Sequence, residues 1–249
     1  MTHIVSSVGW AGIVMAKSVA YFPSVLVRRR SRADLFRQLY ATGIRTLPVI
    51  TVVSLFTGMI LALQVGLELA RFNQEMYLGA AVMLTLIREM APFSCGICLA
   101  AMVGSAIAAE LGTMKVNDEV DALTIMGISP MRFLASPRIL ALVMMSPLLA
   151  FYCCIIGTVG GGLVGLTQLN VDFGQYMVSA MSMAKTKDLF CGLFKALSFG
   201  LIIGTISVAE GLGTRHGATG VGKSTQRSVI LSFLAILIFG YMITRMCYR

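Results

Sequence analysis

The chain has 249 residues, of which 57% are hydrophobic and only 12% are charged, and its formal net charge is +9. Soluble domains usually carry about 25% charged residues, so this composition excludes an ordinary soluble domain, which would have to expose large apolar patches. The mean hydropathy of +0.85 indicates that much of the surface faces lipid.

The N-terminal segment, residues 4–27, is apolar but is interrupted by Lys17 and carries three aromatic residues. It ends at Pro23 and a cluster of arginines that follows the apolar stretch. A secretory signal peptide has its positive charges in front of its apolar stretch, so we do not interpret this segment as one. We predict an amphipathic helix that lies in the membrane interface within residues 1–30, with a sixth membrane span as the alternative.

Five apolar segments further along the chain are long enough to cross a membrane. A bilayer core of about 30 Å needs about 20 apolar residues in a helix, and a helix satisfies all its backbone groups within one segment. The predicted spans are residues 46–67, 76–109, 139–171, 189–209 and 228–244. The sequence therefore predicts an all-α integral membrane protein with a single permease domain over residues 1–249.

Basic residues are distributed unevenly between the segments that connect these spans. With the N-terminus in the cytoplasm, thirteen Lys and Arg residues fall on the inner side and five on the outer side. Membrane proteins concentrate Lys and Arg in their cytoplasmic segments, so this bias predicts a cytoplasmic N-terminus. It also accounts for the positive net charge without a nucleic-acid partner.

Polar residues inside the first two predicted spans are candidates for a substrate cavity. Arg88 and Glu89 lie in the second span, and charges at membrane depth are rare and usually functional. Neighbouring residues on a helix point about 100° apart, so these two are poor partners for each other. A role in a substrate cavity and structural pairing, for instance with Lys195, are the two alternatives. Gln64 in the first span is a weaker candidate.

The predicted cytoplasmic loop, residues 110–137, contains the pattern of a short helix. Asn117 is suited to cap the start of the helix, and Asp118 and Glu119 occupy a first turn, where acidic residues are favoured. Gly127 is suited to end it, because glycine adopts the left-handed backbone conformation that terminates many helices.

The same helix has an apolar stripe at helical spacing, formed by Val120, Leu123 and Met126. An amphipathic helix of this kind is suited to dock in a groove of a partner protein. Packing of the stripe onto the helices of its own chain is the alternative, and the pattern alone favours neither.

Three further motifs have plain structural interpretations. Cys95 and Cys98 form a C-x-x-C pair inside a span, where they are small helix residues rather than a redox site. Gly157, Gly161 and Gly165 form two overlapping G-x-x-x-G units, for which packing within the chain is favoured over a dimer contact. Residues 217–224 match the P-loop pattern, but no α/β domain surrounds them, so we predict a glycine-rich turn.

Together these segments resemble the MlaE family of ABC-transporter permeases. The stretch "AAELGTMKVNDEVDALTIMGISPMRFLASPR" looks like the signature of that family, and "LIREMAP" and "GLGTRHGATGVGKSTQRSV" are similar to its flanking segments. The resemblance extends over about residues 30–241. One departure is at residues 101–104, which read "AMVG" where the family often has "AGRVG".

The resemblance implies a homodimer of five-span subunits in the inner membrane, which moves phospholipid between the inner and outer membranes. It implies an ABC ATPase subunit as partner, a periplasmic Mce-type lipid-binding protein, and room for a small cytoplasmic accessory subunit. The loop helix would then be the coupling helix that contacts the ATPase. Its coupling residues would be Asn117, Asp118, Glu119, Asp121, Leu123 and Gly127.

The sequence therefore predicts a transporter subunit without catalytic residues, metal or cofactor of its own. One alternative is a secondary transporter or channel that acts alone and uses Arg88 and Glu89 as a polar relay. A second is a membrane enzyme that binds nucleotide at residues 217–224.

Overall fold

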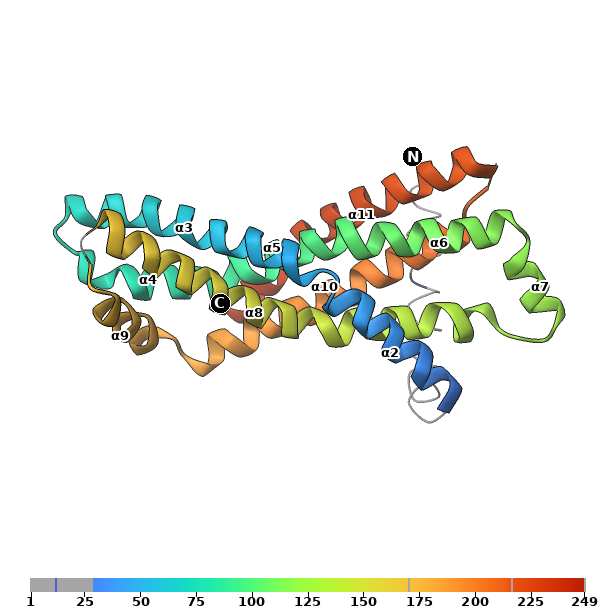
Figure 1. Ribbon diagram of the computed structural model, residues 1–249, viewed down its shortest axis with the longest axis horizontal. Helices are drawn as coiled ribbons and strands as arrows, with labels where there is room; N and C mark the ends of the chain where they lie inside the picture. The colour runs from blue at the N-terminus through green and yellow to red at the C-terminus, as the bar shows by residue number, and fades with distance from the viewer. Residues whose placement is uncertain (1–11, 13–28, 170, 216, 249) are drawn as a thin grey trace. The chain divides into compact units, whose positions relative to one another are not determined.

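The computed structural model describes Gly12 and residues 29–169, 171–215 and 217–248 (Figure 1). The helices in these residues are α2 (Arg29–Gly43), α3 (Leu47–Arg71), α4 (Leu78–Thr85), α5 (Ala91–Leu99), α6 (Ser105–Val116), α7 (Glu119–Ile125), α8 (Ser136–Gln168), α9 (Phe173–Met183), α10 (Thr186–Leu212) and α11 (Gly217–Cys247). A 3₁₀ turn, η1 (Glu75–Tyr77), and three π-helical turns, η2 (Leu86–Met90), η3 (Ala100–Gly104) and η4 (Met131–Ala135), connect some of them.

The predicted all-α membrane class is confirmed. Five continuous helical stretches are long and apolar enough to cross a membrane. They are Ala33–Arg71, Glu75–Val116, Met131–Gln168, Thr186–Leu212 and Gly217–Cys247. The third stretch ends at Gln168, three residues before the end of the predicted span. The interfacial helix predicted over residues 4–27 lies, apart from Gly12, outside the described residues.

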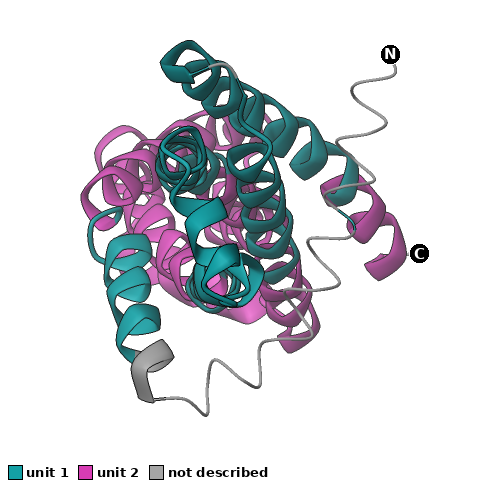
Figure 2. Ribbon diagram, turned by 90° about the vertical axis from the view of Figure 1, so that its right-hand side faces the viewer, with its two compact units in different colours: residues 1–46, 97–146, 197–239 teal, residues 47–96, 147–196, 240–249 magenta. Residues whose placement is uncertain are grey.

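The chain divides into two compact units, which Figure 2 shows in different colours. Unit 1 contains residues 1–46, 97–146 and 197–239, and unit 2 contains residues 47–96, 147–196 and 240–249. Each unit is therefore assembled from segments that are far apart in sequence. The single permease domain remains a prediction.

Unit 2 is held together by close contacts between helix backbones. Gly58 on α3 lies against the backbone of Gly157 on α8, where a larger side chain would collide. Small residues allow such approaches between membrane helices, which have no hydrophobic driving force in lipid. Further along α8, Gly161 packs against Tyr176 of α9. The buried Tyr176 hydroxyl donates a hydrogen bond to the Thr158 carbonyl at 3.1 Å.

The three glycines of the G-x-x-x-G pattern all contact residues of their own chain. Gly165, the last of them, faces Leu78 and Tyr176. Packing within the chain, the favoured interpretation of this pattern, is therefore correct.

Helix α9 was not predicted, and its segment lies between the third and fourth predicted spans. The carboxylate of Asp172 accepts hydrogen bonds from the backbone N–H groups of Gly174 and Gln175, which satisfies two donors of the first turn. Gly79 of α4 then lies against the backbone of α9 at Tyr176 and Ala180. The cap stabilises the start of α9, and the close contact holds the helix against α4.

Unit 1 uses small hydroxyl residues where its helices meet. Ser228 of α11 donates to Ser207 of α10 at 3.0 Å, and the hydroxyls of Thr214 and Ser224 are 2.8 Å apart. These side chains are buried, so each hydrogen bond satisfies polar atoms that lipid cannot. Leu35 of α2 packs against Leu140 and Ala141 at the start of α8.

Candidate functional site

The two charged residues of the second span lie in the π-helical turn η2, directly before Pro92. In an α-helix the carbonyl of Arg88 would accept a hydrogen bond from the N–H of residue 92, but proline has no N–H. The ammonium group of Lys195 on α10 donates to this carbonyl instead, at 2.8 Å. The buried lysine thus supplies this carbonyl with a donor that Pro92 cannot provide.

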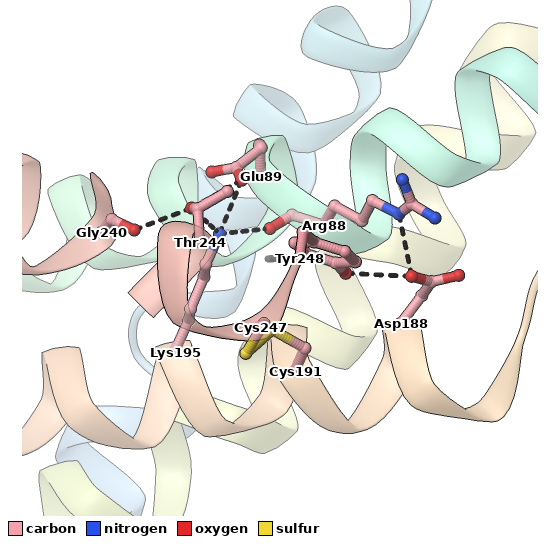
Figure 3. Close-up of a disulfide and its surroundings, with 9 residues drawn as sticks. All are labelled: Arg88, Glu89, Asp188, Cys191, Lys195, Gly240, Thr244, Cys247 and Tyr248. Carbon is pink, nitrogen blue, oxygen red and sulfur yellow. Dashed lines mark hydrogen bonds and ion pairs between the residues drawn. A yellow bond between two sulfur atoms is a disulfide. The ribbon is translucent and has the colours of Figure 1, made fainter. Parts of the chain in front are cut away.

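Lys195 is the centre of the first of two polar pairs. Its side chain is only 1% exposed, and its Nζ also lies 2.7 Å from Glu89 Oε1 and 2.7 Å from the Thr244 hydroxyl. The Thr244 hydroxyl in turn lies 2.9 Å from Glu89 Oε1 and 2.8 Å from the Gly240 carbonyl (Figure 3). With the carbonyl in η2, the three protons of the ammonium group each have an acceptor. The pairing of Glu89 with Lys195, one of the two alternatives, is therefore present.

Asp188 is the centre of the second pair. Its carboxylate is 3% exposed and accepts from Arg88 Nε at 2.9 Å and from the Tyr248 hydroxyl at 3.0 Å. The guanidinium of Arg88 also lies over the Tyr248 ring, 4.6 Å from its centroid. Burial and the hydrogen bond to Asp188 raise the pKa of the Tyr248 phenol to about 12, so this hydroxyl remains a donor at neutral pH.

Helical spacing explains why the two pairs form side by side. Asp188 and Lys195 are seven residues apart, about two turns, so they share one face of α10. Thr244 and Tyr248 are four residues apart and share one face at the end of α11. The face of α10 therefore supplies Lys195 to the first pair and Asp188 to the second, and the end of α11 supplies Thr244 and Tyr248 in the same way. The neighbours Arg88 and Glu89 consequently have different partners. We call these six residues the Lys195–Asp188 cluster.

The exposed members of the cluster come from η2. The side chains of Arg88 and Glu89 are 38% and 40% exposed, whereas their partners on α10 are buried. A ligand can therefore reach one cation and one anion without displacing the buried groups. Gln64 is exposed on α3, and it shares no hydrogen bond with either residue within the described chain.

Sequence reasoning missed several members of this region. Asp188 falls one residue outside the predicted fourth span, and Tyr248 lies beyond the fifth. The seven-residue spacing of Asp188 and Lys195 was the available signal, because it places opposite charges on one helix face.

A disulfide between Cys191 and Cys247 joins α10 to α11 beside the cluster (Figure 3). The two Cα atoms are 6.6 Å apart, within the range of ordinary disulfides. The sequence separation of 56 residues gave no local signal for this pair. The other four cysteines, including the C-x-x-C pair, are thiols.

We expect the denatured protein to incorporate four maleimide groups before reduction and six after it. Intact-mass spectrometry of protein purified without reductant, with and without prior reduction, measures both numbers. The Cys191→Ser variant serves as the matched control, and it should incorporate five groups in both states. Six groups on unreduced wild-type protein would contradict the disulfide.

The start of the predicted loop helix needs correction. Asn117 ends α6 rather than capping the next helix, and α7 begins at Glu119. Asp118 occupies the N-cap position in the left-handed conformation, with φ of 59°, and its side chain makes no capping hydrogen bond. A tight turn at Asn117 and Asp118 therefore joins the two helices.

The end of the same helix is as predicted. Gly127 has φ of +73°, the left-handed conformation that glycine adopts without strain. Its N–H donates to the Thr124 carbonyl at 3.0 Å, and the Ile128 N–H donates to the Leu123 carbonyl at 2.9 Å. These two bonds form a Schellman motif, which satisfies the last carbonyls of α7.

Helix α7 follows α6 and is linked through η4 to α8 (Figure 1). Some of its apolar residues are buried and others are exposed. Val120 is buried and Leu123 is half-buried, so part of the stripe packs against the chain itself. Ile125 and Met126 are 88% and 71% exposed. Asp121 is bound to Lys115 at 2.7 and 2.8 Å, which ties α7 to α6.

Glu119, in the first turn of α7, is exposed and forms no ion pair with another described residue. An acidic start and an apolar tip are thus both available to a partner.

The segment that matches the P-loop pattern forms the first turns of α11, from Gly217 onward. A phosphate-binding loop must wrap around the phosphates before its helix begins, and this segment is already helical. The hydroxyl of Ser224, which would bind magnesium, is buried and hydrogen-bonded to Thr214 and the Val221 carbonyl. The geometry does not support a nucleotide site here.

Comparisons with known proteins bear on the identity of the whole chain. The sequence profile of the family described as permease MlaE matches residues 35–246. A probable ABC transporter permease protein of Rickettsia typhi is 36% identical over 100% of this chain and 99% of its own length. A protein of Synechocystis with the same description is 32% identical over 92% of this chain and 87% of its own length.

A further relative is the intermembrane phospholipid transport system permease protein MlaE of Haemophilus influenzae. It is 30% identical over 96% of this chain and 90% of its own length. The family profile and these relatives extend over nearly the whole chain, including η2, α7 and α10. The chain belongs to the MlaE permease family.

Proposed function

We propose that this chain is the permease subunit of an ABC transporter that moves phospholipid between the inner and outer membranes. A separate ABC ATPase subunit hydrolyses the ATP. The observation that carries this proposal is the apolar tip of α7 in a member of the MlaE permease family, since Ile125 and Met126 are exposed and available to a partner.

The coupling surface consists of the exposed residues of α7 and the residues that shape it. Glu119 offers a charge, Leu123 packs behind the tip, and Gly127 ends the helix. Asp121 holds the helix to α6 through Lys115 and so orients the tip rather than contacting the partner alone. Asn117 and Asp118 form the turn that sets the direction of the helix.

The functional unit is a homodimer that also binds a periplasmic Mce-type lipid-binding protein and a small cytoplasmic accessory subunit. Two of the long apolar stretches support this assembly. In the most apolar windows of Ala33–Arg71 and Gly217–Cys247 only 28% and 17% of residues are buried within the chain, against 44–50% in the other three. These two helices therefore have the largest apolar faces for lipid or a second subunit.

The chain lies in the inner membrane with its N-terminus in the cytoplasm. The distribution of Lys and Arg supports this orientation. It places the Cys191–Cys247 disulfide at the periplasmic ends of α10 and α11, and disulfides persist in that oxidising compartment.

Arg88 and Glu89 form the polar part of the substrate cavity, because each has a half-exposed charge held by a buried partner. Gln64 contributes from α3 as an exposed polar residue. The stand-alone transporter is less well supported, since a proton or ion relay needs groups that change partners. The Lys195 ammonium already has three acceptors.

Transport by the reconstituted complex tests this function. Proteoliposomes that contain the permease and its ATPase should transfer fluorescent phospholipid to an acceptor Mce-type protein only with hydrolysable ATP. Permease alone should transfer none, and a Walker-lysine variant of the ATPase is the matched control. ATP-independent lipid or ion flux through the permease alone would favour the stand-alone transporter.

A further inference from the structure

A cavity of about 420 Å³ lies in unit 1, apart from every residue of the Lys195–Asp188 cluster. Three segments surround it: the second half of α2 with the turn after it, the stretch from η3 to α6, and the stretch from η4 to the start of α8. The volume is within the usual range of small-molecule sites, roughly 300–1,000 Å³. The cavity is therefore large enough for a lipid headgroup and the first part of its acyl chains.

Arg138, one of the lining residues, is a largely buried cation at the cavity wall. Its side chain is only 7% exposed, and its Nη atoms bind Glu110 Oε1 at 2.8 Å and the Leu134 carbonyl at 2.7 Å. Its Nε is buried and has no partner among the described residues. The Arg138 guanidinium is therefore held at the cavity wall by its two Nη bonds, and its charge is only partly offset by the exposed carboxylate of Glu110.

Two more arginines, Arg37 and Arg45, line the same cavity. Both are exposed, and neither forms an ion pair with another described residue. The acidic residues of the lining are Asp34 and Glu110, and Glu110 is already paired. Three guanidinium groups against two carboxylates give the cavity an excess of positive charge, and guanidinium groups bind phosphate with two parallel hydrogen bonds.

Apart from these charged groups, Gln38 and Thr46 are the polar residues of the lining, and the others are apolar. Met102, Val103 and Ala106 line it from the second helical stretch, and Phe133 lines it from η4. A soluble anion would gain nothing from these side chains, whereas a molecule with a phosphate and a hydrocarbon part would contact both walls. The cavity therefore matches an amphipathic anion better than a free one.

We propose that this cavity binds the phosphate group of a glycerophospholipid, with Arg37, Arg45 and Arg138 as its ligands, as a second lipid site at the cytoplasmic leaflet. The lipid identity and the leaflet rest on the proposed function. Occupancy of the cavity does not require ATP, so this site and transport can be tested separately.

Photolabelling of the purified complex tests the site. The probe is phosphatidylglycerol with a diazirine near the carboxyl end of one acyl chain, added in nanodiscs without ATP. Mass spectrometry should find the label on residues 102–107 and 133–138. The double variant Arg37→Gln with Arg45→Gln should reduce this labelling about tenfold or more, the loss expected for one charge-assisted hydrogen bond.

Arg132→Gln is the matched control, because Arg132 lies on η4 but does not line the cavity. It should label like the wild type. Ala106→Trp should reduce the labelling by filling the apolar wall with no change in charge. Excess unlabelled phosphatidylglycerol should compete, whereas inorganic phosphate and diacylglycerol at the same concentration should not.

Three results would overturn the proposal. They are equal labelling of the double arginine variant and the control, competition by diacylglycerol, and displacement by inorganic phosphate, which would indicate a site for soluble anions. If transport fails while the label still maps to the cavity, the lipid site stands and the proposed function does not.

Discussion

Glu89→Ala is expected to lower the free energy of unfolding by about 3–5 kcal/mol, the usual cost of removing one partner from a buried ion pair. The reason is the burial of the other partner. Lys195 is 1% exposed and has Glu89 as its only ion-pair partner within the described chain, so the variant leaves an ammonium group in the membrane without a counterion.

The reverse substitution is expected to cost less. Lys195→Met removes the buried charge and keeps a side chain of similar length, and the Glu89 carboxylate that remains is 40% exposed rather than buried. The double variant should therefore be more stable than Glu89→Ala alone, and close to Lys195→Met. Such a rescue identifies the ion pair, rather than the loss of either side chain, as the source of the effect.

Detergent-solubilised protein and a thermal or denaturant unfolding curve give the measurement. Glu68→Ala is the matched control, because Glu68 pairs with Arg71 at 3.2 Å but both side chains are more than 60% exposed. Exposed pairs contribute less than about 1 kcal/mol. A Glu89→Ala protein as stable as this control would mean that the Lys195 contact has no structural role.

The second large effect is expected at the tip of α7. Ile125→Asp should weaken binding of the ATPase subunit by about 30-fold or more, the effect of removing one interface residue worth about 2 kcal/mol. Ile125 is 88% exposed, so the variant removes apolar contact area from the interface without disturbing the packing of the permease. Copurification and ATPase stimulation by the permease measure the effect.

Val178→Asp provides the matched control, because Val178 is 72% exposed on α9 and equally apolar. It should leave ATPase binding unchanged. Charge reversal by Glu119→Lys should also weaken binding, whereas reversal of Asp121 is harder to interpret because it breaks the bond to Lys115 as well. Normal ATPase binding by Ile125→Asp would exclude the tip of α7 as the docking surface.

Helix positions could be predicted because they depend on local patterns. Apolar runs between charges mark the five long helices, and Gly127 marks the end of α7 through its backbone freedom alone. The start of α7 was placed one residue early. Both Asn117 and Asp118 have capping side chains, and the left-handed turn at Asp118 depends on how α6 ends.

The polar cluster could be predicted only in part, because its partners are about 100 residues apart. Arg88 and Glu89 stand out in an apolar run, and Lys195 was a candidate partner. The choice of Asp188 for Arg88 depends on how η2, α10 and α11 pack. The spacing of these helices is set by small residues such as Gly192, which lies against the backbone of Ile87.

The disulfide closes a covalent ring. Helices α10 and α11 follow each other in the chain, so they are connected at one end by the polypeptide and at the other by Cys191–Cys247. Two helices joined at both ends cannot slide lengthwise past each other or separate at their termini. A conformational change that opens a path for lipid must therefore move the disulfide-linked ends of α10 and α11 together.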